Sequence, residues 1–244
     1  VFVKYGMLSE DKFYDKVKDF SLLKNTAGEY YTMEEYRAKI KDEQTDKNDV
    51  LTLLYSPQKD SHTSYIKAAQ AKGYDVLIMD SVIDTHFLQH LEQKEEKIQF
   101  VRVDSGTPDK LIDKGEEHEE QLNEKQKQKV EGIFKSVVPE NQQLKMEALS
   151  PDDHPVLITR PEFMRRMKEM QQMQGMDMGA MPDMYELVIN TNHKLVSEKL
   201  VRMRSEEKKE KFAKYLFDLA RLNQNMLQGE ELNAFINNSI DMME

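Results

Sequence analysis

The chain of 244 residues contains no cysteine and no tryptophan. The absence of cysteine excludes disulfide bonds, zinc–thiolate sites and cysteine nucleophiles, and it fits a reducing compartment. No apolar run approaches the roughly 18 residues that a membrane-spanning helix needs, so we expect a soluble chain with no membrane partner. The sequence begins with valine and carries no targeting pattern, and we interpret it as an internal fragment of a longer protein.

The charge balance is acidic, and the sequence has no basic stripe. The formal net charge is -10, and charged residues make up 33% of the chain. Nucleic-acid surfaces need clustered lysine and arginine. We therefore expect a soluble protein that does not bind nucleic acid.

The familiar catalytic motifs are also missing. The sequence has no Walker A loop, no G-x-G-x-x-G and no G-x-S-x-G elbow. His86 and His90 have the i, i+4 spacing of metal ligands, but no third ligand is evident, and a solvated or packing role is the simpler interpretation. Paired acids such as Asp152 and Asp153 are expected on solvated faces. We predict no catalytic residue, no metal site and no cofactor bound by this chain.

Residues 1–110 read as alternating strands and helices. Apolar runs at 50–55, 74–79 and 100–103 predict buried strands, and a helix at 64–69 lies between the first two. This spacing implies a small parallel sheet with crossover helices.

Shorter signals surround these strands. Ser9 could cap a helix that runs to about Phe20, and residues 25–28 resemble a hairpin turn. Thr32 begins another helix, and Gly73 is a good signal for the end of a helix.

Residues 111–124 are acidic and poor in apolar side chains, and we expect a linker there. Residues 125–244 then predict a second domain of the α+β class. It begins with a helix that ends near Pro139, and three strands follow at about 143–149, 156–159 and 185–190. Asn192 could cap a short helix.

Two amphipathic helices end the chain. Ser205 can cap the first of them, with two glutamates in its first turn. The apolar stripes consist of Phe212, Leu216, Leu219 and Met226 and of Leu232, Phe235, Ile236 and Ile240. Two such helices from each of two chains could form a four-helix bundle, which predicts a homodimer. The alternative is that both stripes pack back on the same domain.

Methionine is abundant and clustered. Of the 16 methionines, eight lie in one segment: Met164, Met167, Met170, Met173, Met176, Met178, Met181 and Met184. Thr159, Pro161 and Glu162 together predict the start of a helix with Phe163 and the first methionines on one face. Flexible methionine suits surfaces that fit many partners, although a helix packed in the core is the alternative. Membrane-surface binding fits an acidic chain poorly.

Many short segments resemble one family, the ninety-kilodalton heat-shock chaperones, over essentially the whole chain. The middle domain of that family is similar to residues 4–7, 19–25, 53–55, 64–66, 72–77 and 100–104, and the C-terminal domain of its bacterial members to 165–167, 182–185 and 190–193. The resemblance implies a cytoplasmic, homodimeric, ATP-driven chaperone that binds non-native client proteins. It also implies that ATP and magnesium bind in a part of the full-length protein that precedes Val1.

The resemblance also carries residue-level expectations. The family presents client-binding apolar side chains on a helix that corresponds to residues 162–174, and on the loop beside it. Client contact is therefore expected at Phe163, Met164, Met167, Met170, Met173, Met176, Met178 and Met181. A second client patch follows an Ile-Asp pair, here Ile83-Asp84, and would involve His86 and Phe87, although the acidic residue and first aromatic of the family pattern are replaced.

Two other interpretations stay open. One is an enzyme of the α/β type with a site at the carboxyl ends of the strands, near Ser56, Asp80 and Asp104. The other is a purely structural dimerisation module, in which the methionine-bearing helix belongs to the core.

Overall fold

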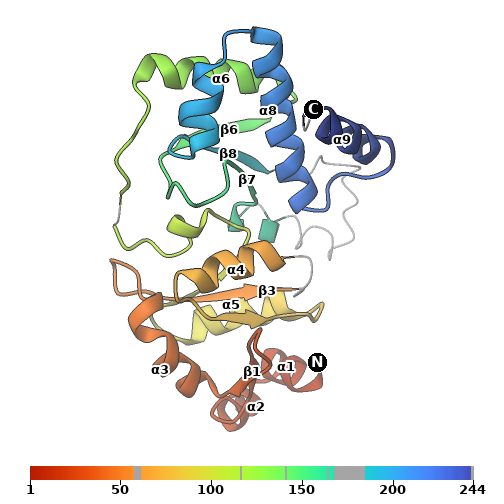
Figure 1. Cartoon of the computed structure of the whole chain (residues 1–244). Helices are drawn as coiled ribbons and strands as arrows, with labels where there is room; N and C mark the ends of the chain where they lie inside the picture. Colours follow the sequence, from red (N-terminus) through yellow and green to blue (C-terminus); the bar gives the residue numbers. More distant parts are fainter. Residues whose placement is uncertain (58–61, 116, 141, 164, 168–184, 243–244) are drawn as a thin grey trace. The chain divides into compact units, whose positions relative to one another are not determined.

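A computed structural model describes residues 1–57, 62–115, 117–140, 142–163, 165–167 and 185–242. The chain forms two compact units (Figure 1). The first comprises residues 1–115 and a segment that begins at Glu162. The second comprises residues 116–161 and the chain from residue 180 onward. The segment at Glu162 therefore belongs to the first unit, although the sequence around it belongs to the second.

The first unit is an α/β structure. Its elements are α1 (Phe2–Ser9), α2 (Asp11–Val17), β1 (Leu23–Lys24), β2 (Tyr30–Tyr31), α3 (Met33–Gln44), β3 (Leu51–Ser56), α4 (Thr63–Ala71), β4 (Val76–Ile78), α5 (Asp84–Lys94), β5 (Ile98–Arg102) and a 3-10 turn (Pro108–Lys110). β3 pairs in parallel with both β4 and β5, in the order β4-β3-β5. The predicted parallel sheet with crossover helices is confirmed.

Alternate side chains of β3 enter two different cores, because successive residues of a strand point to opposite faces. Leu53 and Tyr55 join the cluster that contains Phe87 and Phe100, whereas Leu54 joins the cluster formed with α4. In Figure 1, α4 and α5 lie on opposite sides of β3. Burial on both faces explains why the β3 sequence reads as a nearly continuous apolar run.

The second unit is of the α+β type, as expected. Its elements are α6 (Glu124–Val137), β6 (Gln143–Glu147), β7 (Val156–Thr159), β8 (Glu186–Asn190), a π-helix (Leu195–Leu200), α8 (Glu206–Asn223) and α9 (Gly229–Asp241). β8 lies between the other two strands, parallel to β6 and antiparallel to β7. The main core contains Phe134 from α6, Ile158 from β7 and Leu216 from α8.

Several local signals behave as the sequence predicts. β1 and β2 form the expected antiparallel hairpin. Thr32 caps α3 in a reciprocal capping box with Glu35. Ser205 caps α8, since its side chain accepts a hydrogen bond from the backbone of Lys208. Gly73 follows the end of α4 with φ at +82°, a conformation that glycine adopts without strain.

Two predicted caps are wrong. Ser9 ends α1 and donates to the carbonyl of Tyr5 at 2.8 Å, and α2 follows separately and ends at Val17. The break lets the two helices pack closely, because a Cβ on Gly6 would lie only 2.6 Å from the Phe13 ring. Asn192 does not cap a helix either, because its amide bonds the backbone of the preceding 119–121 segment.

The capping box of α3 generates a stability prediction. The Thr32 hydroxyl accepts from the Glu35 backbone at 3.3 Å, and the Glu35 carboxylate accepts from the Thr32 backbone at 2.8 Å. Thr32→Ala removes the first of these bonds and should cost about 1 kcal/mol, so the α3 amides should exchange hydrogen about fivefold faster. Hydrogen exchange read by mass spectrometry measures this directly.

Ser205→Ala is the reciprocal control, since it removes the cap of α8 in the other unit. It should accelerate exchange in α8 and leave α3 unchanged. Unchanged α3 exchange in Thr32→Ala would show that the box contributes nothing to this helix.

Candidate functional site

In the first turn of the methionine-bearing helix the charged side chains face the protein and the apolar side chains of the described residues face water, the reverse of the usual arrangement. Residues 162, 163 and 165–167 are helical. Glu162, Arg165 and Arg166, at i, i+3 and i+4, share one side of the turn. Phe163 and Met167, four residues apart, share the adjacent side. The charged side faces the first unit, whereas Phe163 is 77% exposed and Met167 43% exposed.

We call the charged side, formed by Glu162, Arg165 and Arg166, the docked face, and Glu162 is its centre. Its Oε1 accepts from the Tyr55 hydroxyl at 3.0 Å and from Arg166 Nε at 2.7 Å, and its Oε2 accepts from the Arg102 backbone at 3.3 Å. Arg165 also donates to Glu162 and to the Tyr55 hydroxyl, and its guanidinium lies over the Tyr55 ring. These contacts fix the first turn at the carboxyl ends of β3 and β5.

Arg166 extends the network to α5. Its guanidinium donates to both carboxylate oxygens of Glu92, at 2.7 and 3.1 Å, in the bidentate geometry that arginine favours. It also donates to the carbonyl of Phe100 at 2.7 Å, and Glu92 accepts from the Phe100 backbone N–H at 2.6 Å. Both backbone groups of Phe100 are thereby satisfied on the open side of β5.

The charges in this network support one another electrostatically. Burial alone would raise the pKa of Glu162, but Arg165 and Arg166 hold that pKa below its ordinary value of 4.5. Burial also favours the neutral form of Arg166, yet Glu92 and Glu162 keep its pKa above the ordinary range. A carboxyl group whose pKa is lowered by folding stabilises the folded state above its ordinary pKa. It loses that contribution as the pH falls through the lowered value, so Glu162 remains an anchor at neutral pH.

This inversion leaves apolar surface in water. Buried charges are costly unless they are paired, and here the pairing is made by fixed partners on the first unit. Among the described residues, Phe163 and Met167 on the adjacent side of the turn stay exposed to water.

The predicted client-contact residues fall into three groups. Phe163 and Met167 are on the exposed face just described. His86 is half-buried on α5, whereas Phe87 is 2% exposed and packs in the core, so it offers a client almost no surface. The remaining residues lie outside the described residues: Met164, Met170, Met173, Met176, Met178 and Met181.

The predicted dimerisation residues also divide. Phe212, Leu216 and Phe235 are buried within the second unit, and Phe235 stacks on Tyr215 at a centroid distance of 5.4 Å. The stripes therefore pack partly on their own domain.

The outer part of each stripe is less buried. Met226 and Leu232 are half-buried. Leu219 is 37% exposed, Ile236 46% and Ile240 54%. Leu222, which is not part of the predicted stripe, is 36% exposed and extends the outer face of α8.

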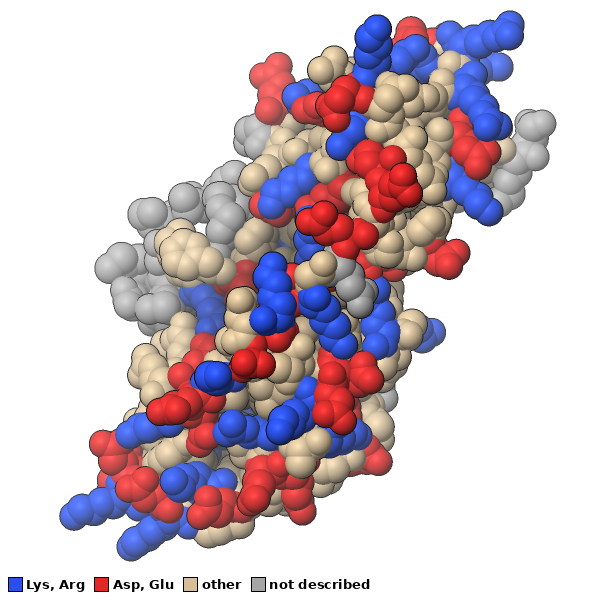
Figure 2. All heavy atoms as spheres, turned by 90° about the vertical axis from the view of Figure 1, so that its left-hand side faces the viewer, with Lys and Arg blue, Asp and Glu red and all other residues tan. Residues whose placement is uncertain are grey.

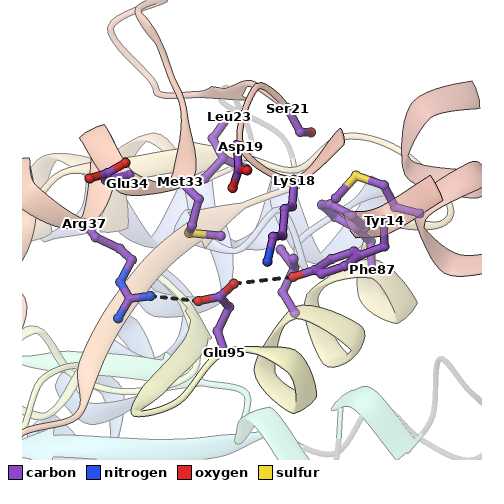
Figure 3. A pocket seen from close by; sticks show the side chains of 12 residues that line it. Tyr14, Lys18, Asp19, Ser21, Leu23, Met33, Glu34, Arg37, Phe87 and Glu95 are labelled. Carbon is purple, nitrogen blue, oxygen red and sulfur yellow. Dashed lines mark hydrogen bonds and ion pairs between the residues drawn. The ribbon is translucent and has the colours of Figure 1, made fainter. Parts of the chain in front are cut away.

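A cavity of about 340 Å³ opens in the first unit between α1, α2, α3 and α5 (Figure 3). Its apolar lining includes Met7 and Phe87. Glu95 joins two walls, since it accepts from Arg37 at 2.8 Å and from the Tyr14 hydroxyl at 3.4 Å. Burial and the neighbouring Glu95 raise the pKa of Tyr14 to about 12, so this hydroxyl is a donor and not a base at neutral pH.

The cluster at the carboxyl ends of β3 and β5 contains a serine, a histidine and an aspartate. Ser56 Oγ is 2.9 Å from His62 Nδ1, and His62 Nε2 is 3.7 Å from Asp104. Asp104 is also bound by the Arg102 guanidinium through two contacts, and both Ser56 and Asp104 are fully buried. Asp80 is exposed. A serine without access to substrate and an aspartate neutralised by arginine favour a packing role for this cluster.

Other binding chemistries find little support. Among the described residues, no group of three or more His, Cys, Asp or Glu side chains could hold a metal ion. Helices in the described part of the chain are too short or too polar to cross a bilayer. On the face shown in Figure 2, basic and acidic side chains are interspersed, unlike the continuous basic stripe of nucleic-acid surfaces.

The sequence matches known proteins along its whole length. The family model for "Hsp90 protein" matches residues 2–244. "Chaperone protein htpG" of Bacteroides fragilis strain YCH46 is 37% identical in an alignment that covers 100% of this chain and 46% of that protein. "Chaperone protein HtpG" of Porphyromonas gingivalis strain ATCC 33277 is 40% identical over 82% of this chain and 30% of its own length.

The chain thus spans about half the length of the curated Bacteroides relatives that it matches, 46% of the first. The match includes both structural units and the segment that carries Glu162 and Arg166. The chain belongs to the Hsp90 family, and to its bacterial HtpG branch.

Proposed function

We propose that this chain is the client-holding and self-dimerising part of an ATP-dependent chaperone that acts in the cytoplasm. The observation that carries the proposal is the outward-facing pair Phe163 and Met167, on a helix turn whose charged side is buried. A non-native protein exposes apolar side chains, and their burial against this face would supply about 25 cal/mol for each Å² removed from water. The names of the relatives, which are chaperones, support the same proposal.

The proposed client face requires no fixed partner geometry. Methionine has three rotatable bonds and a polarizable sulfur, so one face can adapt to side chains of many shapes. Paired charges of the docked face hold the helix backbone, whereas the apolar side chains remain free to adjust. This combination suits recognition of unfolded segments that share composition and not sequence.

For dimerisation, the proposal assigns the outer faces of α8 and α9. Leu219 and Leu222 lie three residues apart on α8, and Ile236 and Ile240 lie four apart on α9. Each pair thus shares one helix face, and packing against a second copy would bury it. The inner residues Phe212, Leu216 and Phe235 would support this surface from within the protomer.

The proposal assigns ATP and magnesium to the part of the family's length that this chain does not span. We therefore expect this chain to show no ATP turnover above the rate of a buffer blank in a coupled assay. Turnover that survives purification and is abolished by Ser56→Ala would favour the enzyme interpretation instead. The burial of Ser56 also argues against a reaction at that serine.

Client binding is tested by charging the exposed face. Phe163→Asp combined with Met167→Asp should weaken the binding of a permanently unfolded protein about tenfold or more, since burial of one such side chain is worth about 1.5–3 kcal/mol. The probe is reduced, carboxymethylated lactalbumin with a fluorescent label, and its anisotropy reports binding.

The matched control combines Phe20→Asp and Leu22→Asp. These side chains are 64% and 56% exposed in the same unit but lie outside the proposed face. The control should bind as tightly as the unaltered protein, and both variants should keep its urea midpoint. Equal binding by the Phe163/Met167 variant would remove this face from the client site.

Dimerisation is tested on α9. Ile236→Asp with Ile240→Asp should convert the dimer to monomers in sedimentation velocity, because four carboxylates in one dimer would have to leave water. Ala234→Asp with Asn238→Asp is the control, since it adds the same charges at the same spacing on a different face of α9, where Ala234 is exposed and Asn238 half-buried. A dimer that persists in the isoleucine variant would place the interface elsewhere.

A further inference from the structure

Glu92 is a partly exposed residue that connects the helix turn to the edge of β5. The residue lies on α5, 74 residues before Arg166 in sequence, and its side chain is 22% exposed. It does not belong to the apolar face. Its carboxylate nevertheless binds both terminal nitrogens of Arg166, and the same carboxylate accepts from the Phe100 backbone.

These contacts determine rotation as well as attachment. A single hydrogen bond leaves a helix turn free to roll, whereas a bidentate guanidinium–carboxylate pair fixes the plane of both groups. Arg166 is also held by Phe100 and by Glu162, so its side chain is constrained from three directions. Met167 is the next residue and Phe163 lies three residues earlier, so the direction of their side chains follows from that of Arg166.

Without the pairing of Glu92 with Arg166, the helix turn would favour the opposite orientation, with its charged side in water. Glu162, Arg165 and Arg166 would gain by returning to water, and Phe163 and Met167 would gain by turning toward the protein. The observed arrangement is therefore maintained by the partners on the first unit and opposes the intrinsic preference of the side chains.

We propose that Glu92 is a positioning residue for the client face, which holds Arg166 so that Phe163 and Met167 point outward. The inference rests on the proposed client-binding function, because it assigns a purpose to that orientation. Glu92 itself contacts no client. Its contribution is made wholly through Arg166 and the edge of β5.

The test uses the absence of native cysteine, which makes any introduced thiol unique. Arg165→Cys places a thiol on the docked face, where the native side chain is 7% exposed. Its rate of alkylation by iodoacetamide reports how often this face opens to water. Glu92→Gln keeps the shape of the side chain and an oxygen for the Phe100 N–H, but removes the charge that pairs with Arg166.

Alkylation of the Arg165→Cys thiol should accelerate about tenfold or more when Glu92→Gln is added, because Arg166 then loses one of its two charged partners, the bidentate one, at a largely buried position. Glu95→Gln is the matched control. It is the same change three residues further on, at the residue that follows α5, and it also disrupts an arginine pair, the one with Arg37 at 2.8 Å. This control should leave the alkylation rate unchanged.

The second measurement is client binding in the protein without the introduced cysteine. Glu92→Gln should weaken binding of the labelled unfolded protein severalfold, and Glu95→Gln should not. An unchanged alkylation rate in Glu92→Gln would overturn the positioning role. Faster alkylation with unchanged client binding would overturn its link to the client face.

These outcomes are separable from a failure of the proposed function. If Phe163→Asp with Met167→Asp leaves client binding intact, the client face is wrong, whereas the alkylation result still reports on Glu92. A urea midpoint of Glu92→Gln close to that of Glu95→Gln would show that general unfolding does not cause the acceleration.

Discussion

The arrangement of the first unit depends on how the open edge of β5 is satisfied. Among the described residues, β5 is the last strand of the β4-β3-β5 sheet, and no strand pairs with the backbone groups on its outer side. Glu92, Arg166 and Glu162 take these groups at Phe100 and Arg102, two residues apart on the same edge. Charged side chains here make the hydrogen bonds to backbone groups that a neighbouring strand would make inside a sheet. In doing so they bring a helix turn with exposed apolar residues onto the sheet.

Much of the fold follows from patterns that the sequence displays openly. The parallel sheet is predictable because β3 and β4 are short apolar runs separated by a helix of the right length. The cap of α3 is predictable because Thr32 and Glu35 have capping-box spacing. The Ser9 prediction failed because the backbone is extended at Glu10 and separates α1 from α2, which lets Gly6 pack against Phe13. Sequence spacing does not reveal a contact between helices.

The candidate site was predictable only in part. The apolar face at Phe163 and Met167 follows from helical spacing, and its likeness to the Hsp90 family suggested a purpose. The docked face did not follow, because Glu162, Arg165 and Arg166 look like the solvated side of an ordinary amphipathic helix. Their partners Tyr55 and Glu92 are 107 and 74 residues distant. The terminal stripes were found correctly as apolar, but sequence could not tell that Phe212 and Leu216 face inward and Ile236 and Ile240 outward.

The sequence discontinuity of the first unit has a consequence for biosynthesis. Residues 1–115 leave the ribosome well before Glu162 and Arg166, and domains fold from the N-terminus as they emerge. Until then the outer side of β5 lacks two of its ligands, and the nascent sheet presents an open edge. The contact between Glu92 and Arg166 restricts the long stretch of chain between them. The entropy lost when this contact forms grows only with the logarithm of the length of that stretch. The outer edge of β5 is therefore fully bonded only after the helix turn at Glu162 has been synthesised. A chain that ends before this turn would expose a strand edge prone to aggregation.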